Sequence, residues 1–372
     1  MMKISVCYIV KNEENNLPLS LETVKDVADE LVIVDTGSSD GTVRIAKEAG
    51  AKLFYFQWGD DFSAPRNFAI GQAVGDWIVF LDADEGFLYP ERVREQLQKI
   101  DEMRPSVDAV MITRVNVDPE TDRQQGNDQA VRLFRNLPQI RYQGRIHENV
   151  AYSGGSLRLH KDDGALALYH TGYAGKVGLQ KDERNLRLLQ QDVAEHGEQP
   201  GQYMYFADCY LNLKDYGRAM KNAILALDSP VQPAASRVRL FHVAIESMRQ
   251  LAWPLEEQLA LSEAAIGEYP NQPEFYGERG MILCGMGRLE EARASLARAV
   301  ALYESEALPV GAETYFTDRA AAIAYGRLGE LEALRGDREA AERYFRKALE
   351  TDGANEELRE KYRNFRQGIK SS

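Results

Sequence analysis

Short runs of β-branched and aromatic residues alternate with amphipathic stretches up to about residue 170, and this alternation leaves few folds open to the chain. The predicted strands cover residues 3–10, 30–35, 52–56 and 77–82. The predicted helices between them cover residues 17–27, 42–49 and 64–73, with Ser38, Ser39 and Asp40 as candidate N-caps of the second helix. Such a pattern is typical of an α/β domain with a mostly parallel sheet, in which ligands bind at the carboxyl edge of the strands.

From residue 177 onward the pattern is helical throughout and rich in Ala, Leu, Glu, Arg and Tyr. Segments such as LGELEALRGDREAAERYFRKALE place small residues at helical spacing around a Gly-Asp or Gly-Arg turn, which is typical of tetratricopeptide repeats. Residues 236–267 indicate a degenerate helix pair, interrupted at Trp253 and Pro254. The 372 residues are therefore expected to form an α/β domain over residues 1–176 and three or four stacked helical hairpins over residues 177–372.

Composition and charge exclude several classes of protein. The net charge of −13 would repel nucleic acid and anionic lipid, so neither is an expected partner. No apolar run approaches the roughly 20 residues of a transmembrane helix, and the first ten residues lack a signal-peptide pattern. The cysteines, Cys7, Cys209 and Cys284, are too few and too scattered for a zinc site or a disulfide framework and are expected to be buried small hydrophobes. A cytoplasmic protein is expected.

The segment GDWIVFLDADEGF gives the sharpest local signal, because a hydrophobic strand ends in Asp82, Ala83, Asp84 and Glu85. Alternation along an extended segment would point Asp82 and Asp84 to the same side. Two carboxylates placed in this way could ligate one hard divalent cation, Mg²⁺ or Mn²⁺. The alternative is a solvated acidic turn, but the position after a buried strand favours a metal or nucleotide site.

Polar residues at other strand ends are expected at the same edge. Asp35 closes an apolar strand, where its carboxylate could accept a hydrogen bond from a nucleotide base or only cap the following turn. Asn12 and Glu13 follow the first strand and could meet a ribose or base, or cap the next helix. Arg66 stands at a helix start, where a guanidinium suits a phosphate, although it could instead pair with the aspartates of DDFSAPRN.

Six motifs together resemble a known enzyme family. In chain order they are SVCYIVKNEENNL, LVIVDTGSSDGT, APRNFAI, GDWIVFLDADE, GRIHENV and YHTGY. They resemble family 2 glycosyltransferases of the GT-A fold, in particular bacterial members that join the catalytic domain to tetratricopeptide-like helices, such as peptide S-glycosyltransferases and lipopolysaccharide-core transferases. The resemblance implies an inverting, metal-dependent transfer from a nucleotide-diphosphate sugar, with UDP as the favoured nucleotide, to a peptide, glycan or lipid-linked acceptor.

The resemblance also implies roles for individual residues at the donor site. Val10, Asn12 and Glu13 would surround the base and the ribose. Asp35 would make the contact to a uracil-type base that the aspartate of the second strand makes in the family. Asp82 would face the ribose or the metal ion.

The implied metal ligands are Asp82, Asp84 and His170, with Asp84 as the most direct ligand. His170 matches a histidine that often completes the metal or diphosphate shell of this fold, although by itself it could be a structural hydrogen-bonding residue. Inverting transfer also needs a carboxylate that deprotonates the acceptor. The Glu-Asp pair that supplies this base in many relatives is absent, so the sequence favours Glu148, with His147 beside the acceptor or holding the loop.

The helical half is expected to bind the acceptor, a partner protein or a second copy of the chain. The main alternative is a non-catalytic scaffold with a degenerate transferase domain, although Asp35, Asp82, Asp84 and Glu148 all keep the carboxylates that catalysis would need. A nucleotide-sugar pyrophosphorylase would have a glycine-rich loop after the first strand. The corresponding segment, VKNEENNL, contains no glycine.

Overall fold

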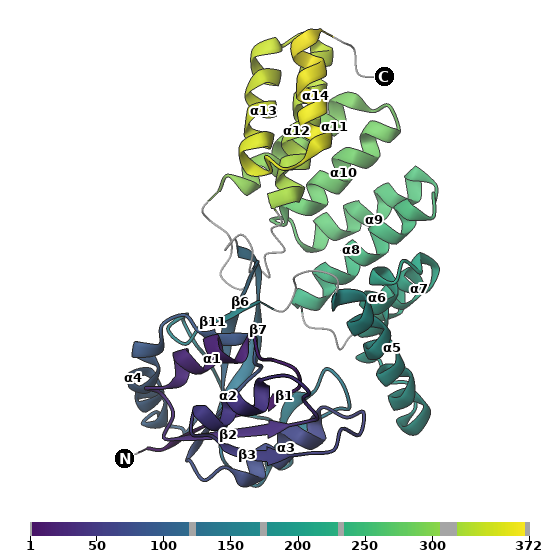
Figure 1. Cartoon of the computed structure of the whole chain (residues 1–372). Coiled ribbons are helices and arrows are strands. Elements are labelled where there is room, and N and C mark those ends of the chain that lie inside the picture. The colour runs from purple at the N-terminus through teal and green to yellow at the C-terminus, as the bar shows by residue number, and fades with distance from the viewer. Residues whose placement is uncertain (1, 119–123, 172–176, 230–233, 306–317, 369–372) are drawn as a thin grey trace. The chain divides into compact units, whose positions relative to one another are not determined.

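The structure of the chain is a computed structural model that describes residues 2–118, 124–171, 177–229, 234–305 and 318–368 (Figure 1). Its contacts divide the chain into two compact units, Met1–His196 and Gly197–Ser372. The boundary expected at residue 176 lies outside the described residues. The helix that follows it, α5 (Val177–His196), is counted with the first unit.

Within the described residues, the first unit contains a nine-stranded mixed sheet of order β3-β2-β1-β4-β7-β6-β11-β5, with β10 paired to β6. Its strands are β1 (Ile4–Val10), β2 (Glu30–Asp35), β3 (Lys52–Tyr55), β4 (Trp77–Leu81), β5 (Glu85–Phe87), β6 (Ala109–Val117), β7 (Gln124–Arg135), β10 (Leu159–Lys161) and β11 (Leu168–His170). Strands β1 to β4 run parallel, as the alternation predicts. Strand β7 runs antiparallel to both β4 and β6. The expected α/β domain with a mostly parallel sheet is confirmed.

Helical layers cover both faces of this sheet. The helices are α1 (Leu17–Val24), α2 (Thr42–Glu48), α3 (Ser63–Gln72) and α4 (Pro90–Asp101). Trp77, Val79 and Leu81 of β4 share a core with α1, α2 and α4, whereas Ile78 and Phe80 pack with α3 and the hairpin of β8 (Ile140–Gln143) and β9 (Asn149–Tyr152). Because both faces are covered, β4 is apolar along its length, and its first polar side chains come at the edge of the sheet.

The loop before α2 differs from the expected capping pattern. The N-cap of α2 is Gly41, which has no side chain to cap the helix. The Oγ of Ser38 accepts a hydrogen bond from the amide of Asn12 at 2.9 Å, and Oδ2 of Asp40 accepts one from the amide of Glu14 at 3.2 Å. Ser38 and Asp40 therefore join the ends of β1 and β2. Oδ1 of Asp40 also accepts a hydrogen bond from the Thr42 amide at 3.0 Å, at the start of α2, so Asp40 caps the helix from the position before Gly41.

The second unit is a row of antiparallel helix pairs (Figure 1). Its helices are α6 (Gln202–Asn212), α7 (Tyr216–Leu227), α8 (Ala234–Gln250), α9 (Leu255–Glu268), α10 (Pro273–Gly285), α11 (Leu289–Tyr303), α12 (Asp318–Arg335), α13 (Arg338–Thr351) and α14 (Glu356–Gln367). The turn between α8 and α9 falls at Trp253 and Pro254, where the sequence predicts it. Helix pairs pack closely through small residues: a Cβ atom on Gly280 of α10 would lie 2.6 Å from Cγ of Leu296 on α11. The predicted helical repeats are confirmed.

Candidate active site

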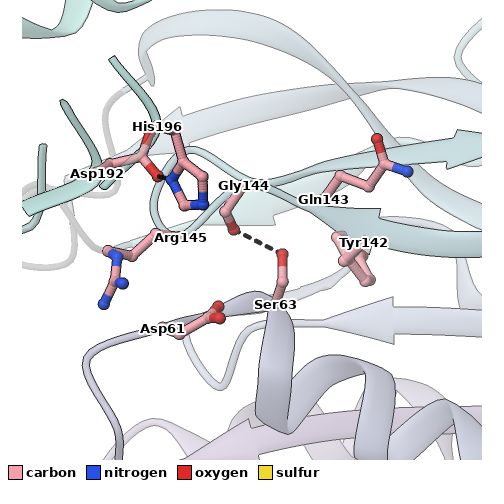
Figure 2. Close-up of a pocket in the computed structure, with 8 residues that line it drawn as sticks. All are labelled: Asp61, Ser63, Tyr142, Gln143, Gly144, Arg145, Asp192 and His196. Carbon is pink, nitrogen blue, oxygen red and sulfur yellow. Dashed lines mark hydrogen bonds and ion pairs between the residues drawn. The ribbon is translucent and has the colours of Figure 1, made fainter. Parts of the chain in front are cut away.

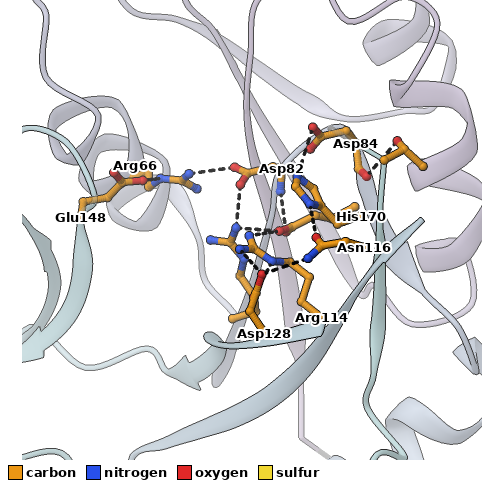
Figure 3. Close-up of polar contacts among 11 residues, drawn as sticks. Arg66, Asp82, Asp84, Arg114, Asn116, Asp128, Glu148 and His170 are labelled. Carbon is orange, nitrogen blue, oxygen red and sulfur yellow. Dashed lines mark hydrogen bonds and ion pairs between the residues drawn. The ribbon is translucent and has the colours of Figure 1, made fainter. Parts of the chain in front are cut away.

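The candidate site lies where the chain leaves β4. Strand β4 ends at Leu81, and residues Asp82 to Glu85 form a turn closed by a 3.0 Å hydrogen bond from the Glu85 amide to the Asp82 carbonyl. Because this segment turns, the alternation of an extended strand does not apply to it. The carboxylates of Asp82 and Asp84 bind different partners instead of facing one point, which corrects the sequence prediction (Figure 3).

Asp82, itself half-buried, belongs to a set of alternating positive and negative side chains of which Arg66, Arg132 and Glu85 are buried. Its Oδ1 accepts a hydrogen bond from Nη2 of Arg66 at 2.7 Å, and its Oδ2 accepts one from Nη2 of Arg132 at 2.6 Å. Arg132 also donates to Oε1 of the fully buried Glu85 at 2.7 Å. Burial alone would raise the pKa of Asp82, but the two guanidinium groups outweigh it and hold that pKa well below its usual range.

The whole set, called here the arginine–carboxylate network, consists of Arg66, Arg114, Arg132, Asp82, Glu85, Asp128 and Glu148. Arg66 joins Asp82 to the predicted base, because its Nε donates to Oε1 of Glu148 at 2.6 Å. The rings of Phe80 and Tyr142 lie 4.8 and 5.1 Å from the guanidinium carbon of Arg66. With 5% of its side chain exposed, Arg66 is fixed by its neighbours and presents little surface to a phosphate.

The loop between β8 and β9 brings Glu148 to Arg66. At the start of α3, Ser63 donates through Oγ to the carbonyl of Gly144 at 2.6 Å, and the Phe62 amide donates to the carbonyl of Arg145 at 2.8 Å. His147 lies in the same loop with a left-handed backbone, φ 53°. Burial, with the charge of Lys181 adding to it, lowers the pKa of His147 to about 4, so its imidazole is neutral at physiological pH.

The sequence left open a pairing of Arg66 with the aspartates just before it, and this alternative is wrong. Asp60 instead pairs with Arg187 of α5, where the shorter N–O distance is 2.6 Å. Asp61 accepts a hydrogen bond from the Ala64 amide at 3.2 Å and so caps the start of α3.

Asp84 and His170 lie together at the far side of the turn. Oδ2 of Asp84 is 3.5 Å from Nε2 of His170. The other ring nitrogen, Nδ1, is 2.8 Å from Oδ1 of Asn116, and the amide group of Asn116 donates to Asp128 at 3.4 Å. Nδ1 of His170 therefore faces the side chain of Asn116, and Nε2 faces Asp84.

These residues fit a divalent cation only in part. Across the described ranges, no group of three His, Cys, Asp or Glu side chains is arranged to hold a metal ion. Asp84 and His170 suit a cation that also takes oxygen ligands from a diphosphate, as Mg²⁺ and Mn²⁺ do. Asp82 does not suit it in this arrangement, because both of its oxygens are held by arginines.

The other predicted donor-site residues gather at the ends of β1 and β2. Asp35 is 3% exposed, and its Oδ2 accepts hydrogen bonds from the amides of Gly37 at 3.0 Å and Ser38 at 3.1 Å. Gly37 adopts φ +109°, which this tight turn could not easily obtain from another residue. Asn12 accepts a hydrogen bond from the amide of Ser39 at 2.8 Å. Asp35 therefore makes the turn-capping contacts that the sequence left open for it, whereas Asn12 binds the loop after β2 and not the next helix.

Glu13 faces the same edge. Its Oε2 accepts a hydrogen bond from Nδ2 of Asn16 at 2.8 Å. Burial raises the pKa of Glu13, and the negative charges of Asp84 and Asp82 raise it further. Val10 is buried at the end of β1 and is paired with Asp35 in the sheet. The strand-end residues therefore surround one edge of the sheet, as predicted.

A cleft of about 420 Å³ lies beside the loop that carries Glu148 (Figure 2). Its lining residues are Asp61, Ser63, Tyr142, Gln143, Gly144, Arg145, Asp192 and His196. Asp192 and His196 come from α5 and are joined by a 3.1 Å contact. Glu148 is not among the lining residues, so the cleft is a neighbour of the candidate site and not part of it.

Strands β6 and β7 supply further residues of the network that were not predicted from the sequence. Arg114 makes a bidentate pair with Asp128 at 2.9 and 3.0 Å, and these two residues are directly opposite in the β6–β7 register. Arg114 also donates to Glu85 at 2.9 Å. The sequence does contain one indication of these residues. Arg114 and Asn116 are two residues apart, so in a strand their polar side chains lie on the same face.

Comparisons with known proteins agree with this architecture. A family model described as Glycosyl transferase family 2 matches residues 5–163, and one described as Tetratricopeptide repeat matches residues 322–355. The TPR repeat-containing protein Synpcc7942_0270 of Synechococcus elongatus is 33% identical over 311 residues, covering 76% of this chain and 73% of that protein. The SPbeta prophage-derived glycosyltransferase SunS of Bacillus subtilis is 29% identical over 215 residues, covering 56% of this chain and 49% of SunS.

Among solved structures, the chain is similar to glucosyl-3-phosphoglycerate synthase from Mycobacterium tuberculosis, crystallised with Mn²⁺, UDP and glucosyl-3-phosphoglycerate. The TM-score is 0.27 at 21% identity, covering 31% of this chain and 44% of that one. A likeness of this size carries no functional argument. No helix in the described ranges is both long enough and apolar enough to cross a membrane.

Proposed function

Because the chain belongs to the family 2 glycosyltransferases that carry tetratricopeptide repeats, we propose that it transfers a sugar, with inversion, from a UDP sugar to a peptide, glycan or lipid-linked acceptor. The glycosyl transfer itself follows from the family. The nucleotide, the requirement for a divalent cation and the acceptor class are our proposals.

The observation that carries the proposal is the pairing of Asp84 with His170 beside an arginine-held Asp82. Asp84 Oδ2 and His170 Nε2 would hold Mn²⁺ or Mg²⁺ together with the donor diphosphate. When bound, such a cation stabilises the negative charge that develops on the leaving diphosphate. Asp82 is 31% exposed and its oxygens keep further lone pairs, so it can accept hydrogen bonds from a ribose while the arginines fix its orientation.

Glu148 is the proposed general base. Arg66 holds its Oε1 at 2.6 Å, and 10% of the side chain is exposed. An acceptor hydroxyl or thiol that reaches the second oxygen could transfer its proton there as it attacks the anomeric carbon. His147, in the same loop, is neutral and is proposed to hold the loop or contact the acceptor.

The helical unit is proposed to bind a polypeptide: the acceptor, a partner protein or a second copy of the chain. Stacked helix pairs form an extended surface suited to such binding. This role is separate from donor chemistry, since every predicted donor-site residue lies in the first unit.

Calorimetric titration with UDP, with and without Mn²⁺, tests the proposal. Mn²⁺ should strengthen UDP binding to the wild type, and Asp84→Asn and His170→Gln should lose that enhancement while keeping the fold. Asp163→Asn is the matched control, because Asp163 is exposed and is not among the proposed ligands. UDP affinity that does not respond to Mn²⁺ in the wild type, or an Asp84→Asn variant that responds fully, would refute the metal assignment.

A further inference from the structure

Helices α8 and α10 carry a second group of ionisable side chains, one buried and two half-buried, far in sequence from the candidate active site. Nδ1 of His242 on α8 lies 2.8 Å from Oε1 of Glu278 on α10. Glu274 is one helical turn before Glu278 and is 6% exposed. The ring of His242 packs against Phe275 with centroids 4.7 Å apart. His242, Glu274 and Glu278 are called here the α8/α10 cluster.

The α8/α10 cluster has more hydrogen-bonding atoms than partners. Oε2 of Glu274 accepts a hydrogen bond from Nε2 of Gln272 at 2.5 Å. Three other atoms of the cluster are buried and have no hydrogen-bond partner among the described residues: Oε1 of Glu274, Oε2 of Glu278 and Nε2 of His242. Leaving a buried acceptor without a donor costs free energy. A ligand that supplies hydrogen-bond donors would therefore stabilise the cluster.

The charges of the cluster are also unbalanced. Glu274 and Glu278 stand at positions i and i+4 of one helix, where like charges repel each other. A protonated His242 balances one of the two carboxylates and leaves a net charge of −1. Arg239, on the same helix as His242, donates to Asp208 at 2.8 Å. Burial raises the pKa of Glu274, which is the expected response of a carboxylate with too little positive charge nearby.

We propose that the α8/α10 cluster binds one basic side chain, of arginine or lysine, from a polypeptide held by the helical unit. A guanidinium or ammonium group supplies both the missing positive charge and several N–H donors. Access is from the surface, because 16% of the His242 side chain and 27% of the Glu278 side chain are exposed. The inference rests on the polypeptide-binding role proposed for this unit and adds the chemical class that the unit recognises.

Fluorescence anisotropy on the full chain tests the proposal. The probe is a labelled Gly/Ser peptide with one central arginine, and the matched peptide carries citrulline, which has a similar shape but no charge. The arginine peptide should bind at least tenfold more tightly than the citrulline peptide, and Glu274→Gln should remove at least tenfold of that affinity. Glu257→Gln, an equal change of charge at an exposed position of α9, should bind like the wild type.

Thermal unfolding separates a binding role from a purely structural one. Glu274→Gln removes an unmatched buried charge, so the proposal expects an unchanged or higher Tm together with weaker peptide binding. Glu278→Gln, at a more exposed position, provides a second variant with the same expected loss of binding. The proposal is overturned if the arginine and citrulline peptides bind equally well. It is also overturned if Glu274→Gln and Glu278→Gln both keep full affinity for the arginine peptide, or if Glu257→Gln loses as much affinity as they do. Binding of UDP is measured separately, so either proposal can fail without the other.

Discussion

Both units of the molecule bury carboxylates, but they treat the charge in opposite ways. In the catalytic unit, Asp82 is held by two arginines, and Glu148 is held by one of them. In the helical unit, Glu278 contacts His242, and Glu274 accepts a hydrogen bond from the neutral amide of Gln272. In the first arrangement the buried atoms without a partner are the donors Arg66 Nη1 and Arg132 Nε, whereas in the second they include the carboxylate oxygens Glu274 Oε1 and Glu278 Oε2.

The two arrangements suit different tasks: the first positions side chains within the chain, and the second suits the binding of an external group. A buried ion pair adds little net stability compared with an apolar core, but it fixes geometry, since breaking it leaves an uncompensated charge. The arginine–carboxylate network therefore holds Asp82 and Glu148 in defined places around the turn after β4. The α8/α10 cluster, with one carboxylate in excess, is instead suited to an external cation.

The largest effect is expected at Glu148. Glu148→Gln keeps the size of the side chain but removes its basicity, so transfer should fall roughly 10²–10⁴-fold, the usual contribution of a positioned base. UDP binding should remain within a few fold of the wild type, because Glu148 is not a proposed donor ligand. Initial rates with saturating donor, compared with a UDP titration, check both parts. Transfer near the wild-type rate would identify another base, with His147 the first to test.

Removing Arg132 should affect stability strongly. Arg132→Met leaves Oδ2 of Asp82 and Oε1 of Glu85 without this donor, and breaking a buried ion pair costs about 3–5 kcal/mol. Chemical unfolding of the two proteins measures the difference. The control is Arg44→Met, whose pair with Glu48 is exposed on both sides and should change stability far less. If both variants lose the same small amount of unfolding free energy, the network does not fix Asp82 and Glu148 in place.

Much of the fold could be predicted because it depends on local pattern. The alternation of residues 3–82 predicts β1 to β4, and the repeated small residues and the Trp253–Pro254 break predict the helix pairs. Strands β6 and β7 were missed. The second half of β6 carries polar side chains such as Arg114 and Asn116, which obscure the apolar pattern of a strand.

The candidate site was predicted in part for a similar reason. The parallel strands bring Asp35 and Asp82 to one edge whatever else the chain does. The partners of Asp82 could not be predicted, because Arg132 is 50 residues away in sequence and its approach depends on the complete sheet. The turn after Leu81 likewise depends on the pairing of β5 with β11, which no local pattern predicts.

If donor chemistry belongs to the catalytic unit alone, a chain ending at His196 should bind UDP and Mn²⁺ within about threefold of the full chain. This end point keeps α5, whose Arg187 pairs with Asp60 of the catalytic unit. The shortened chain should fail to bind the arginine peptide, because it lacks the α8/α10 cluster. Titrations of UDP and peptide against both proteins check this. A tenfold loss of UDP affinity in a folded shortened chain would contradict the separation of the two roles.

The smallest expected effect is an opposite response of the two units to pH. The pKa of Asp82 is depressed, because its arginines outweigh burial, so its stabilisation is present above the ordinary carboxyl pKa of about 4 and is lost as pH falls. Burial would lower the pKa of His242, but the carboxylates of Glu278 and Glu274 outweigh it and raise that pKa. The stabilisation from His242 is therefore complete below about pH 6.5 and is lost as pH rises through its folded-state pKa.

Comparing the wild type with a variant at each position isolates the pH-dependent stabilisation of His242 and of Asp82 from that of other groups. The Tm difference between wild type and His242→Gln should shrink between about pH 6 and pH 9, as His242 loses its proton in both the folded and unfolded chains. The difference between wild type and Asp82→Asn should shrink instead as pH falls below about 4. A His242→Gln difference that stays constant across the upper range would mean that the imidazole is neutral in the folded state. The two carboxylates of α10 would then have no cation within the cluster, and the net charge available to a basic ligand would be −2 wherever both are ionised.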